Sequence, residues 1–290
     1  MAYLGIIFAL IALLCWGFGD FFIQRASRKI GIVQALFFNT LVVAVLVLPF
    51  VYTQLIDSLG STTFWILIAS GIIVFFTALL QFRVLEIGKL SVVEPVASLE
   101  LPFTVLIAAA LGSEILSLPS YVLITIVFIG ITMTVSSRIS HLGILLTKFE
   151  KGTFIALAGA LGMALTNFLY GHGGQISSPL LAFWIIETVI MILSGVYLIY
   201  SDQFRHLYKD FKKAPGAIIA ESTFDNIAWL SFTFAVLYIP ISVAIAISES
   251  YIILAVVLGV LVNRERLKHH QYLGVFVAFV GVLLLAITSG

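Results

Sequence analysis

The chain has 290 residues, of which 61% are hydrophobic and only 10% are charged, and its mean hydropathy is +1.18. Soluble domains carry about 25% charged residues, so the composition excludes an ordinary soluble protein and indicates an integral membrane protein. The net charge of +1 gives no reason to expect a nucleic acid as partner, and a single cysteine, Cys15, excludes an intrachain disulfide and a cysteine-based metal site.

Ten apolar runs follow one another along the chain, each near the length of about 20 residues that a helix needs to cross a bilayer. In chain order the predicted spans cover residues 2–24, 31–51, 63–85, 91–112, 119–137, 152–171, 179–200, 214–238, 241–262 and 271–288. The first run lacks the basic start and the cleavage site of a signal peptide, so we expect it to be retained. The predicted fold class is an all-α integral membrane protein with ten transmembrane helices.

The basic residues are distributed on one side of this predicted topology. All 15 lysines and arginines fall in alternate loops, namely Arg25, Arg28, Lys29, Arg83, Lys89, Arg138, Lys148, Lys151, Arg205, Lys209, Lys212, Lys213, Arg264, Arg266 and Lys268. Cytoplasmic loops of membrane proteins are enriched in these residues. We therefore expect a multi-pass protein of a prokaryotic plasma (inner) membrane, with the basic loops in the cytoplasm and both termini outside.

The two halves of the chain, residues 1–140 and 141–290, resemble each other. The segment GSEILSLPSYVLITIVFIGITM (112–133) lies over NRERLKHHQYLGVFVAFVGVLL (263–284) without a gap, which aligns Gly130 with Gly281. A looser match of residues 13–22 with 160–169 aligns Asp20 with Asn167. Because each half has five spans, an odd number, the second half is predicted to be inverted, as in many secondary transporters. Chance similarity among helices rich in Leu, Val and Gly is the alternative.

The first span contains Trp16-Gly17, and the two halves end in the segments ELPFTVLIAAALGSEILSLPSYVLITIVFIGI and YIILAVVLGVLVNRERLKHHQYLGVFVAFVGV. In these features the chain resembles the EamA-type members of the drug/metabolite transporter superfamily. The resemblance covers essentially the whole chain and implies a ten-helix transporter of two inverted five-helix repeats. It does not specify the substrate, because the superfamily handles amino acids, amines, sugars, drugs and nucleotide sugars. Ten-helix members are often drawn with cytoplasmic termini, whereas the charges here predict the reverse.

Half of the 14 acidic residues fall within predicted spans. A charged side chain at the bilayer centre is unfavourable by about 2.5–3.5 kcal/mol on insertion scales. These residues are Asp20, Glu94, Glu100, Glu187, Glu221, Asp225 and Glu249. No lysine or arginine lies deep in a span to neutralise them. We expect these acids to face a wet cavity, to share protons or to meet a cation.

The position of each acid along its span predicts its role. Glu100, Glu187, Asp225 and Glu249 lie near mid-span and are predicted to form a central acidic site. The alternative for these four is helix-to-helix hydrogen bonding as protonated acids. Two further acids, Asp20 and Glu221, are predicted to line the route to the cytoplasm. For Asp20 and Glu94, which lie near cytoplasmic ends, pairing with basic loop residues is the alternative.

Three of the four tryptophans stand one helical turn from an intramembrane acid. Trp16 precedes Asp20 by four residues, Trp184 precedes Glu187 by three, and Trp229 follows Asp225 by four. Residues at these spacings share a helix face, and aromatic rings beside carboxylates suit amines and quaternary ammonium ions through cation–π attraction. Tyr251, two residues after Glu249, is expected as a further wall of the site. The alternative for Trp16 is the aromatic belt at the membrane surface.

These patterns predict a secondary-active transporter of small organic cations or zwitterionic amines that works by alternating access and is coupled to protons. An exporter of amino acids or other neutral metabolites, whose acids serve protons alone, is the alternative. A non-transporting membrane interaction subunit is the alternative from another class. We expect no enzyme activity, no cofactor and no metal site. The expected partners are a small-molecule substrate, protons and the lipid bilayer; one chain suffices for one pathway, and a dimer is left open.

Overall fold

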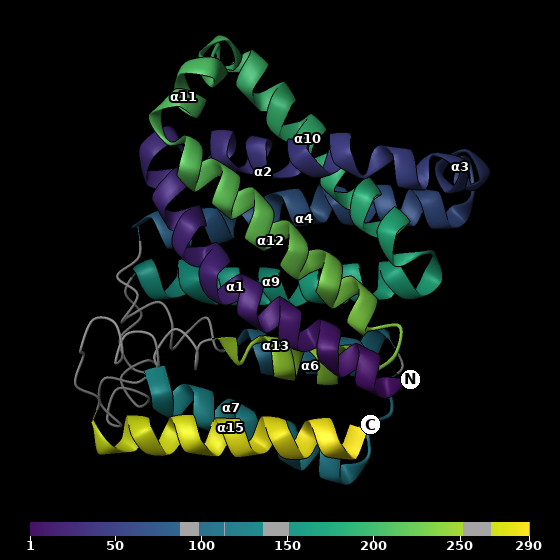
Figure 1. Cartoon of the computed structure of the whole chain (residues 1–290), viewed down its shortest axis with the longest axis vertical. Coiled ribbons are helices and arrows are strands. Elements are labelled where there is room, and N and C mark those ends of the chain that lie inside the picture. The colour runs from purple at the N-terminus through teal and green to yellow at the C-terminus, as the bar shows by residue number, and fades with distance from the viewer. Residues whose placement is uncertain (88–98, 113, 136–150, 252–267, 290) are drawn as a thin grey trace.

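The computed structural model describes residues 1–87, 99–112, 114–135, 151–251 and 268–289. Within these ranges the regular structure is helical (Figure 1). The first half contains α1 (Ala2–Ile30), α2 (Ile32–Leu46), α3 (Leu48–Ser58), α4 (Thr62–Ile87), α6 (Glu100–Leu111) and α7 (Leu118–Val135). The second half contains α9 (Lys151–Ile176), α10 (Pro179–Tyr200), η1 (Phe204–His206), α11 (Leu207–Lys213), α12 (Pro215–Ala235), α13 (Ile241–Ser248) and α15 (His269–Ser289).

Each of the ten predicted spans overlaps at least one of these helices, but the number of membrane crossings is established only in part. Four helices of the described residues are long and apolar enough to cross a membrane: Ala2–Ile30, Thr62–Arg83, Pro179–Tyr200 and His269–Thr288. The bent pair α2 and α3 makes a fifth if it forms one span. Large parts of the predicted spans 91–112 and 241–262 lie outside the described residues. Ten crossings therefore stay a prediction.

The predicted span 31–51 is not one straight helix. It begins at Gly31, whose φ of 98° ends α1 in a conformation that suits glycine. It then breaks after Leu46, where α2 and α3 meet at an angle of 80°. Pro49 lies at the start of α3 and has no N–H to continue the hydrogen-bond ladder of α2. The sequence-based prediction missed this bend because the run stays apolar across it.

The contacts between helices repeat across the two halves. Helix α1 packs on α12, and their counterparts in the other half, α9 and α4, also pack on each other. Two further contacts join a helix to its own counterpart: α2 packs on α10, and α7 packs on α15. The aligned glycines show the relation at atomic scale: a side chain at Gly130 would meet Ala278, and one at Gly281 would meet Val127. The offset that aligns Gly130 with Gly281 also aligns Val127 with Ala278. One contact is thus the image of the other under an approximate twofold relation between the halves.

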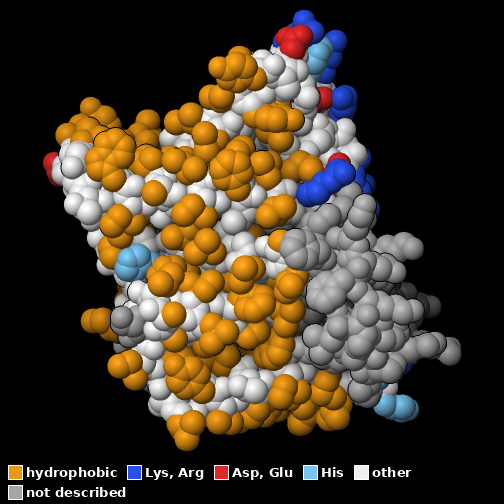
Figure 2. Space-filling view, turned by 180° about the vertical axis from the view of Figure 1, so that it is seen from behind, with side chains coloured by type: hydrophobic (Ala, Val, Ile, Leu, Met, Phe, Trp, Pro, Cys, Tyr) orange, Lys and Arg blue, Asp and Glu red, His pale blue; other side chains and the backbone are white. Residues whose placement is uncertain are grey.

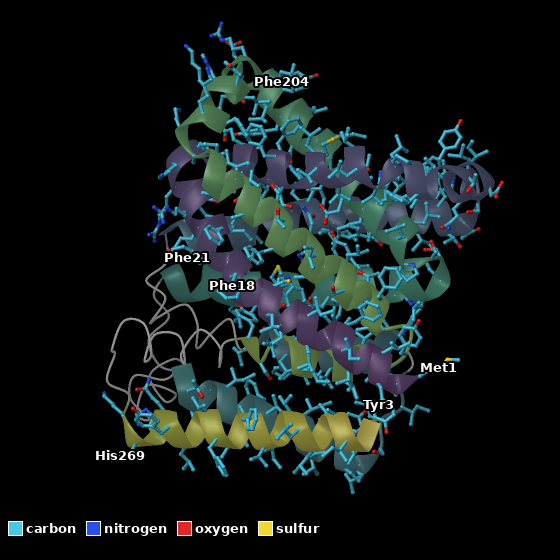
Figure 3. All side chains as sticks on the ribbon, in the orientation of Figure 1. Met1, Tyr3, Phe18, Phe21, Phe204 and His269 are labelled. Carbon is cyan, nitrogen blue, oxygen red and sulfur yellow. The ribbon has the colours of Figure 1, made fainter. Side chains whose placement is uncertain are left out.

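The counterpart helices α7 and α15 run antiparallel, as inversion requires, because Gly130 lies against Ala278 and Gly274 lies against Thr134. In Figure 1 the C-terminus of α15 and the N-terminus of α1 lie at the same end of the molecule. Figure 3 labels Met1 at that end and His269, the first residue of α15, at the opposite end. Figure 2, seen from behind, shows hydrophobic side chains spread over one face and the visible lysines and arginines gathered along one edge, which is the side opposite Met1 in Figure 3. Charge and termini are therefore separated along the helix direction.

Candidate functional site

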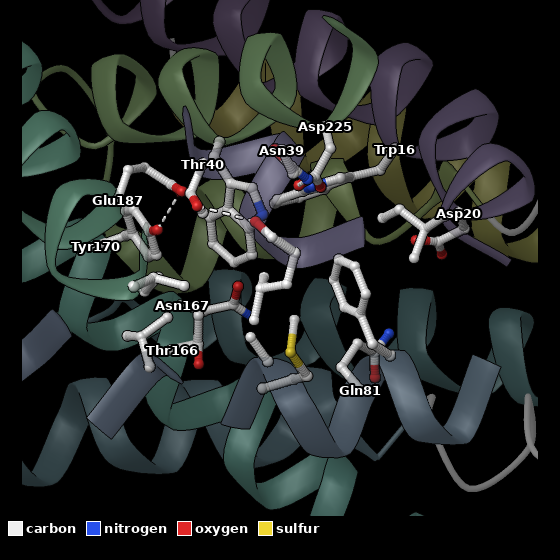
Figure 4. Close-up of a pocket in the computed structure, with 18 of the residues that line it drawn as sticks. Trp16, Asp20, Asn39, Thr40, Gln81, Thr166, Asn167, Tyr170, Glu187 and Asp225 are labelled. Atoms are coloured by element: carbon white, nitrogen blue, oxygen red, sulfur yellow. Dashed lines mark hydrogen bonds between the residues drawn. The ribbon is translucent and has the colours of Figure 1, made fainter. Parts of the chain in front are cut away.

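A cavity of about 70 Å³ lies among the helices, enough for about five to seven water molecules at 10–15 Å³ each. It is drawn in Figure 4. Eight of the ten predicted site residues line it: Trp16, Asp20, Glu100, Glu187, Asp225, Trp229, Glu249 and Tyr251. The spans that contribute them are far apart in the sequence, so the fold brings together side chains from both halves of the chain.

Five of the residues lining the cavity are acids. Asp20 comes from α1, Glu100 from the first turn of α6, Glu187 from α10 and Asp225 from α12, and Glu249 follows directly after α13. Among the described residues that line the cavity there is no lysine or arginine. The wall therefore carries carboxyl groups without a basic side chain to neutralise them, which leaves protons or a bound cation to do so.

Asp225 is held by a chain of amide side chains between α2 and α12. The Nδ2 of Asn39 donates to Oδ2 of Asp225 at 2.7 Å. The Nδ2 of Asn226 donates in turn to Oδ1 of Asn39, also at 2.7 Å. Asn39 is only 2% exposed, so these bonds are shielded from water. They fix both the amide orientation of Asn39 and the position of the carboxyl group of Asp225.

Three other acids each accept a hydrogen bond from another helix or segment. Tyr170 of α9 donates its hydroxyl to Oε1 of Glu187 at 2.5 Å. Asn167, one turn earlier in α9, donates to Oε1 of Glu100 at 2.6 Å. Tyr251 donates to Oδ2 of Asp20 at 2.9 Å. Each bond uses one oxygen of its carboxyl group and leaves acceptor capacity for a ligand.

Aromatic rings form part of the wall between these acids. The rings of Trp16 and Trp229 meet edge to face, with centroids 5.0 Å apart. The ring of Tyr170 stacks on that of Trp229, with centroids 4.5 Å apart. Both tryptophans are less than 10% exposed, which places them in the interior rather than in an interfacial belt. A row of three rings therefore runs along the cavity.

Two of the predicted site residues lie outside the cavity wall. Trp184 donates its indole N–H to the backbone oxygen of Ala44 in α2 at 3.1 Å, so it joins helices instead of facing the cavity. Glu221 is 0% exposed, and neither of its carboxyl oxygens has a hydrogen-bond partner among the described residues. Of the remaining acids, Glu94 lies outside the described residues.

The suggested pairing of Asp20 with a loop arginine is not seen. Among the described residues the ion pairs are Arg83–Glu86, Arg205–Asp202 and Lys213–Asp210. Asp20 instead accepts its hydrogen bond from Tyr251 and lines the cavity. The described part of the chain also holds no group of three or more His, Cys, Asp or Glu side chains arranged to bind a metal ion.

Sequence reasoning missed Tyr170 and also the position of Asn39 next to Asp225. Tyr170 follows Asn167 by three residues in α9, which puts both on one helix face. That spacing could have identified Tyr170, because it places a tyrosine and an asparagine on the same side of an apolar span. Further polar wall residues are Thr40, Gln81 and Thr166.

A model of the EamA-like transporter family matches the chain twice, over residues 3–136 and 150–287. The chain belongs to the EamA-like transporter family. The two matches correspond to the two halves recognised in the sequence, so this EamA-like protein is a multi-pass membrane transporter of small molecules with a two-repeat architecture. Members of the family are transporters and not enzymes.

The fold is also found among solved structures. One protein crystal structure covers 98% of this chain and 98% of its own, with a TM-score of 0.66 and 15% sequence identity. At that identity the likeness shows the fold alone. The comparison with curated proteins gives no match.

Proposed function

We propose that this EamA-like protein is a secondary-active transporter of small organic cations or zwitterionic amines, working by alternating access and coupled to protons. The observation that carries the proposal is the cavity with five acidic and five aromatic residues in its wall and no lysine or arginine among its described lining residues. An ammonium group can meet both a carboxylate and the face of an indole there. An anionic substrate would be repelled by the same wall.

The same acids supply the proton coupling. A carboxyl group in a site with little water is costly when ionised and unpaired, so it is expected to bind a proton when the cation leaves. Exchange of a cation for protons would keep the cavity close to neutral in every state. We propose Glu100, Glu187, Asp225 and Glu249 as the shared binding groups, with Asp20 on the route to the basic side. Glu221, buried one turn from Asp225, would be a separate proton site.

The proposed orientation follows the charges. The basic edge faces the cytoplasm of a plasma (inner) membrane of prokaryotic type, and both termini face outward. The two repeats, residues 1–140 and 141–290, form one pathway within one chain, so a monomer suffices.

Uptake into proteoliposomes tests this proposal. The purified chain is reconstituted, and the flux of labelled tetraethylammonium is measured with and without a pH gradient. We expect flux that the gradient drives and that Asp225→Asn combined with Glu249→Gln abolishes. Asp57→Asn is the matched control, because Asp57 is an exposed acid of α3 away from the cavity. Absence of flux for any amine, with or without the gradient, would overturn the proposal.

A second candidate is an exporter of amino acids or other neutral metabolites that uses the acids for protons alone. The observation in its favour is that four of the five cavity acids already accept a hydrogen bond from a protein side chain. In that case labelled amino acids would be transported, and tetraethylammonium would neither be transported nor compete. A non-transporting subunit would give no flux with either class of solute.

A further inference from the structure

Two of the five carboxyl groups of the cavity, those of Glu187 and Asp20, lie at opposite ends of the view in Figure 4. Figure 4 shows Glu187 and Tyr170 at one end and Asp20 at the other, with Asp225 and Trp16 between them. The two end carboxyls are positioned by equivalent means, because each accepts the hydroxyl of a tyrosine: Tyr170 for Glu187 and Tyr251 for Asp20. Each end thus presents an oriented acceptor towards the space between them.

The wall between the two ends is aromatic. Helices α1 and α12 run antiparallel, because Gly5 lies against Ala235 and Gly19 lies against Asp225. Trp16 is one turn from Asp20, which is about 6 Å along the helix at 1.5 Å per residue. Its ring meets Trp229, and Trp229 stacks on Tyr170, the residue that holds Glu187. The rings of Trp16, Trp229 and Tyr170 therefore form part of the wall between the carboxyl of Asp20 and that of Glu187, beside the carboxyl of Asp225.

We propose that the preferred cargo is a linear aliphatic diamine, with one ammonium group at the Asp20 end, the other at the Glu187 end and the methylene chain along the rings of Trp16 and Trp229. This inference rests on the proposed function and adds a substrate class to it. A single ammonium ion fills one end and leaves the other carboxyl unpaired. A dication neutralises both, and its methylene chain lies against the rings of Trp16 and Trp229, where burial of methylene groups is favourable.

The preference for a diamine can be measured by comparing two amines that have the same carbon chain and a different number of ammonium groups. 1,4-Diaminobutane and 1-aminobutane have the same carbon chain and differ by one ammonium group. Charge pairs in sites that exclude water often contribute a tenfold change in affinity or more. We therefore expect the diamine to bind about tenfold more tightly than the monoamine. We expect a diamine shortened to two carbons to lose part of this advantage, because its two ammonium groups lie closer together.

The test measures binding of both amines to the purified full chain by competition with labelled 1,4-diaminobutane. It is repeated for Asp20→Asn and Glu187→Gln, each of which removes the charge at one end, and for the exposed control Asp57→Asn. The preference for the diamine should fall to about one in either end variant and stay near tenfold in the control. Equal affinity of the unmodified chain for both amines would overturn the diamine inference while leaving organic-cation transport standing. Absence of binding and flux for every amine would overturn the proposed function itself.

Folding of each variant is checked by its thermal unfolding in detergent. If an end variant fails to fold, Tyr251→Phe and Tyr170→Phe replace it, because each removes only the hydroxyl that orients one end carboxyl. Each phenylalanine variant is expected to lower the preference for the diamine over 1-aminobutane. An unchanged preference in both would refute the assignment of these two ends.

Discussion

The hydrogen bond from Asn39 to Asp225 offers a test of the cavity geometry that needs no substrate. Asn39 is 2% exposed and Asp225 is 9% exposed, and their side-chain atoms are 2.7 Å apart. Replacing Asn39 by alanine leaves the carboxyl of Asp225 without this donor. A buried polar group that loses its partner costs about 1–3 kcal/mol, whereas coupling between side chains within membrane bundles averages about 0.6 and reaches about 1.7 kcal/mol.

A double-mutant cycle isolates the pair. The variants Asn39→Ala and Asp225→Ala and their combination are compared by thermal unfolding in detergent, and we expect a coupling free energy of about 1–1.5 kcal/mol. Each kcal/mol corresponds to a shift of about 2–4 °C in unfolding temperature, so a coupling of this size is measurable. Asn39→Ala combined with Asp57→Ala is the control, and its effects should add within about 0.3 kcal/mol. If the cavity pair is equally additive, the hydrogen bond is absent and Asp225 does not occupy the position beside Asn39.

Three further changes test the surroundings of the site. Gly130→Leu places a side chain where even a Cβ would lie 2.4 Å from the backbone nitrogen of Ala278. Overpacking should lower the free energy of unfolding by about 1–3 kcal/mol, and an unchanged melting curve would contradict the contact between α7 and α15. Glu114→Ala removes the carboxylate that accepts hydrogen bonds from the first N–H groups of α13, which should cost about 0.5–2 kcal/mol; Glu114→Gln should recover part of it in the same melting assay. Glu221→Met should raise the unfolding temperature, because a buried carboxyl without hydrogen-bond partners is replaced by an apolar side chain. A lower unfolding temperature would show that the carboxyl of Glu221 does have a hydrogen-bond partner.

Helical spacing explains which site residues the sequence could identify. Trp16 with Asp20 and Asp225 with Trp229 are four residues apart, which is about 40° around a helix, and both pairs face the cavity. Trp184 and Glu187 are three apart, which is about 60° in the other sense. On the buried helix α10 that difference is enough for Trp184 to meet α2 while Glu187 meets Tyr170. A spacing rule gives the face of a helix but not the neighbour on that face.

Partners on other helices could not be predicted for the same reason. Asn39 and Tyr170 are ordinary polar positions within apolar spans, and only the packing of α2 on α12 and of α9 on α10 brings them to acids. The predicted helices agree better with the structure, because long apolar runs determine helices strongly. The bend at Pro49 is a local backbone effect within such a run, so hydropathy does not reveal it.

The repeat makes a prediction about the two hydrogen bonds that cross between the halves of the chain. The alignment that places Tyr251 on Glu100 and Asn167 on Asp20 converts the bond from Asn167 to Glu100 into the bond from Tyr251 to Asp20. In both bonds the acid lies in the first half of the chain and the donor, an amide or a phenol, lies in the second half. Donor and acceptor are therefore exchanged between the equivalent positions.

This exchange can be reversed by mutation. Tyr251→Glu alone places a second acid against Asp20, so it should lower the unfolding temperature by removing a donor and adding a like charge. Adding Asp20→Asn recreates the amide–acid pair that Asn167 and Glu100 already form, and it should recover at least half of the loss. Asp20→Asn by itself keeps a hydrogen-bonding partner for Tyr251 and should change the unfolding temperature least of the three. A double variant no more stable than Tyr251→Glu would mean that the two hydrogen bonds are not equivalent, and the twofold relation would then stop at the backbone.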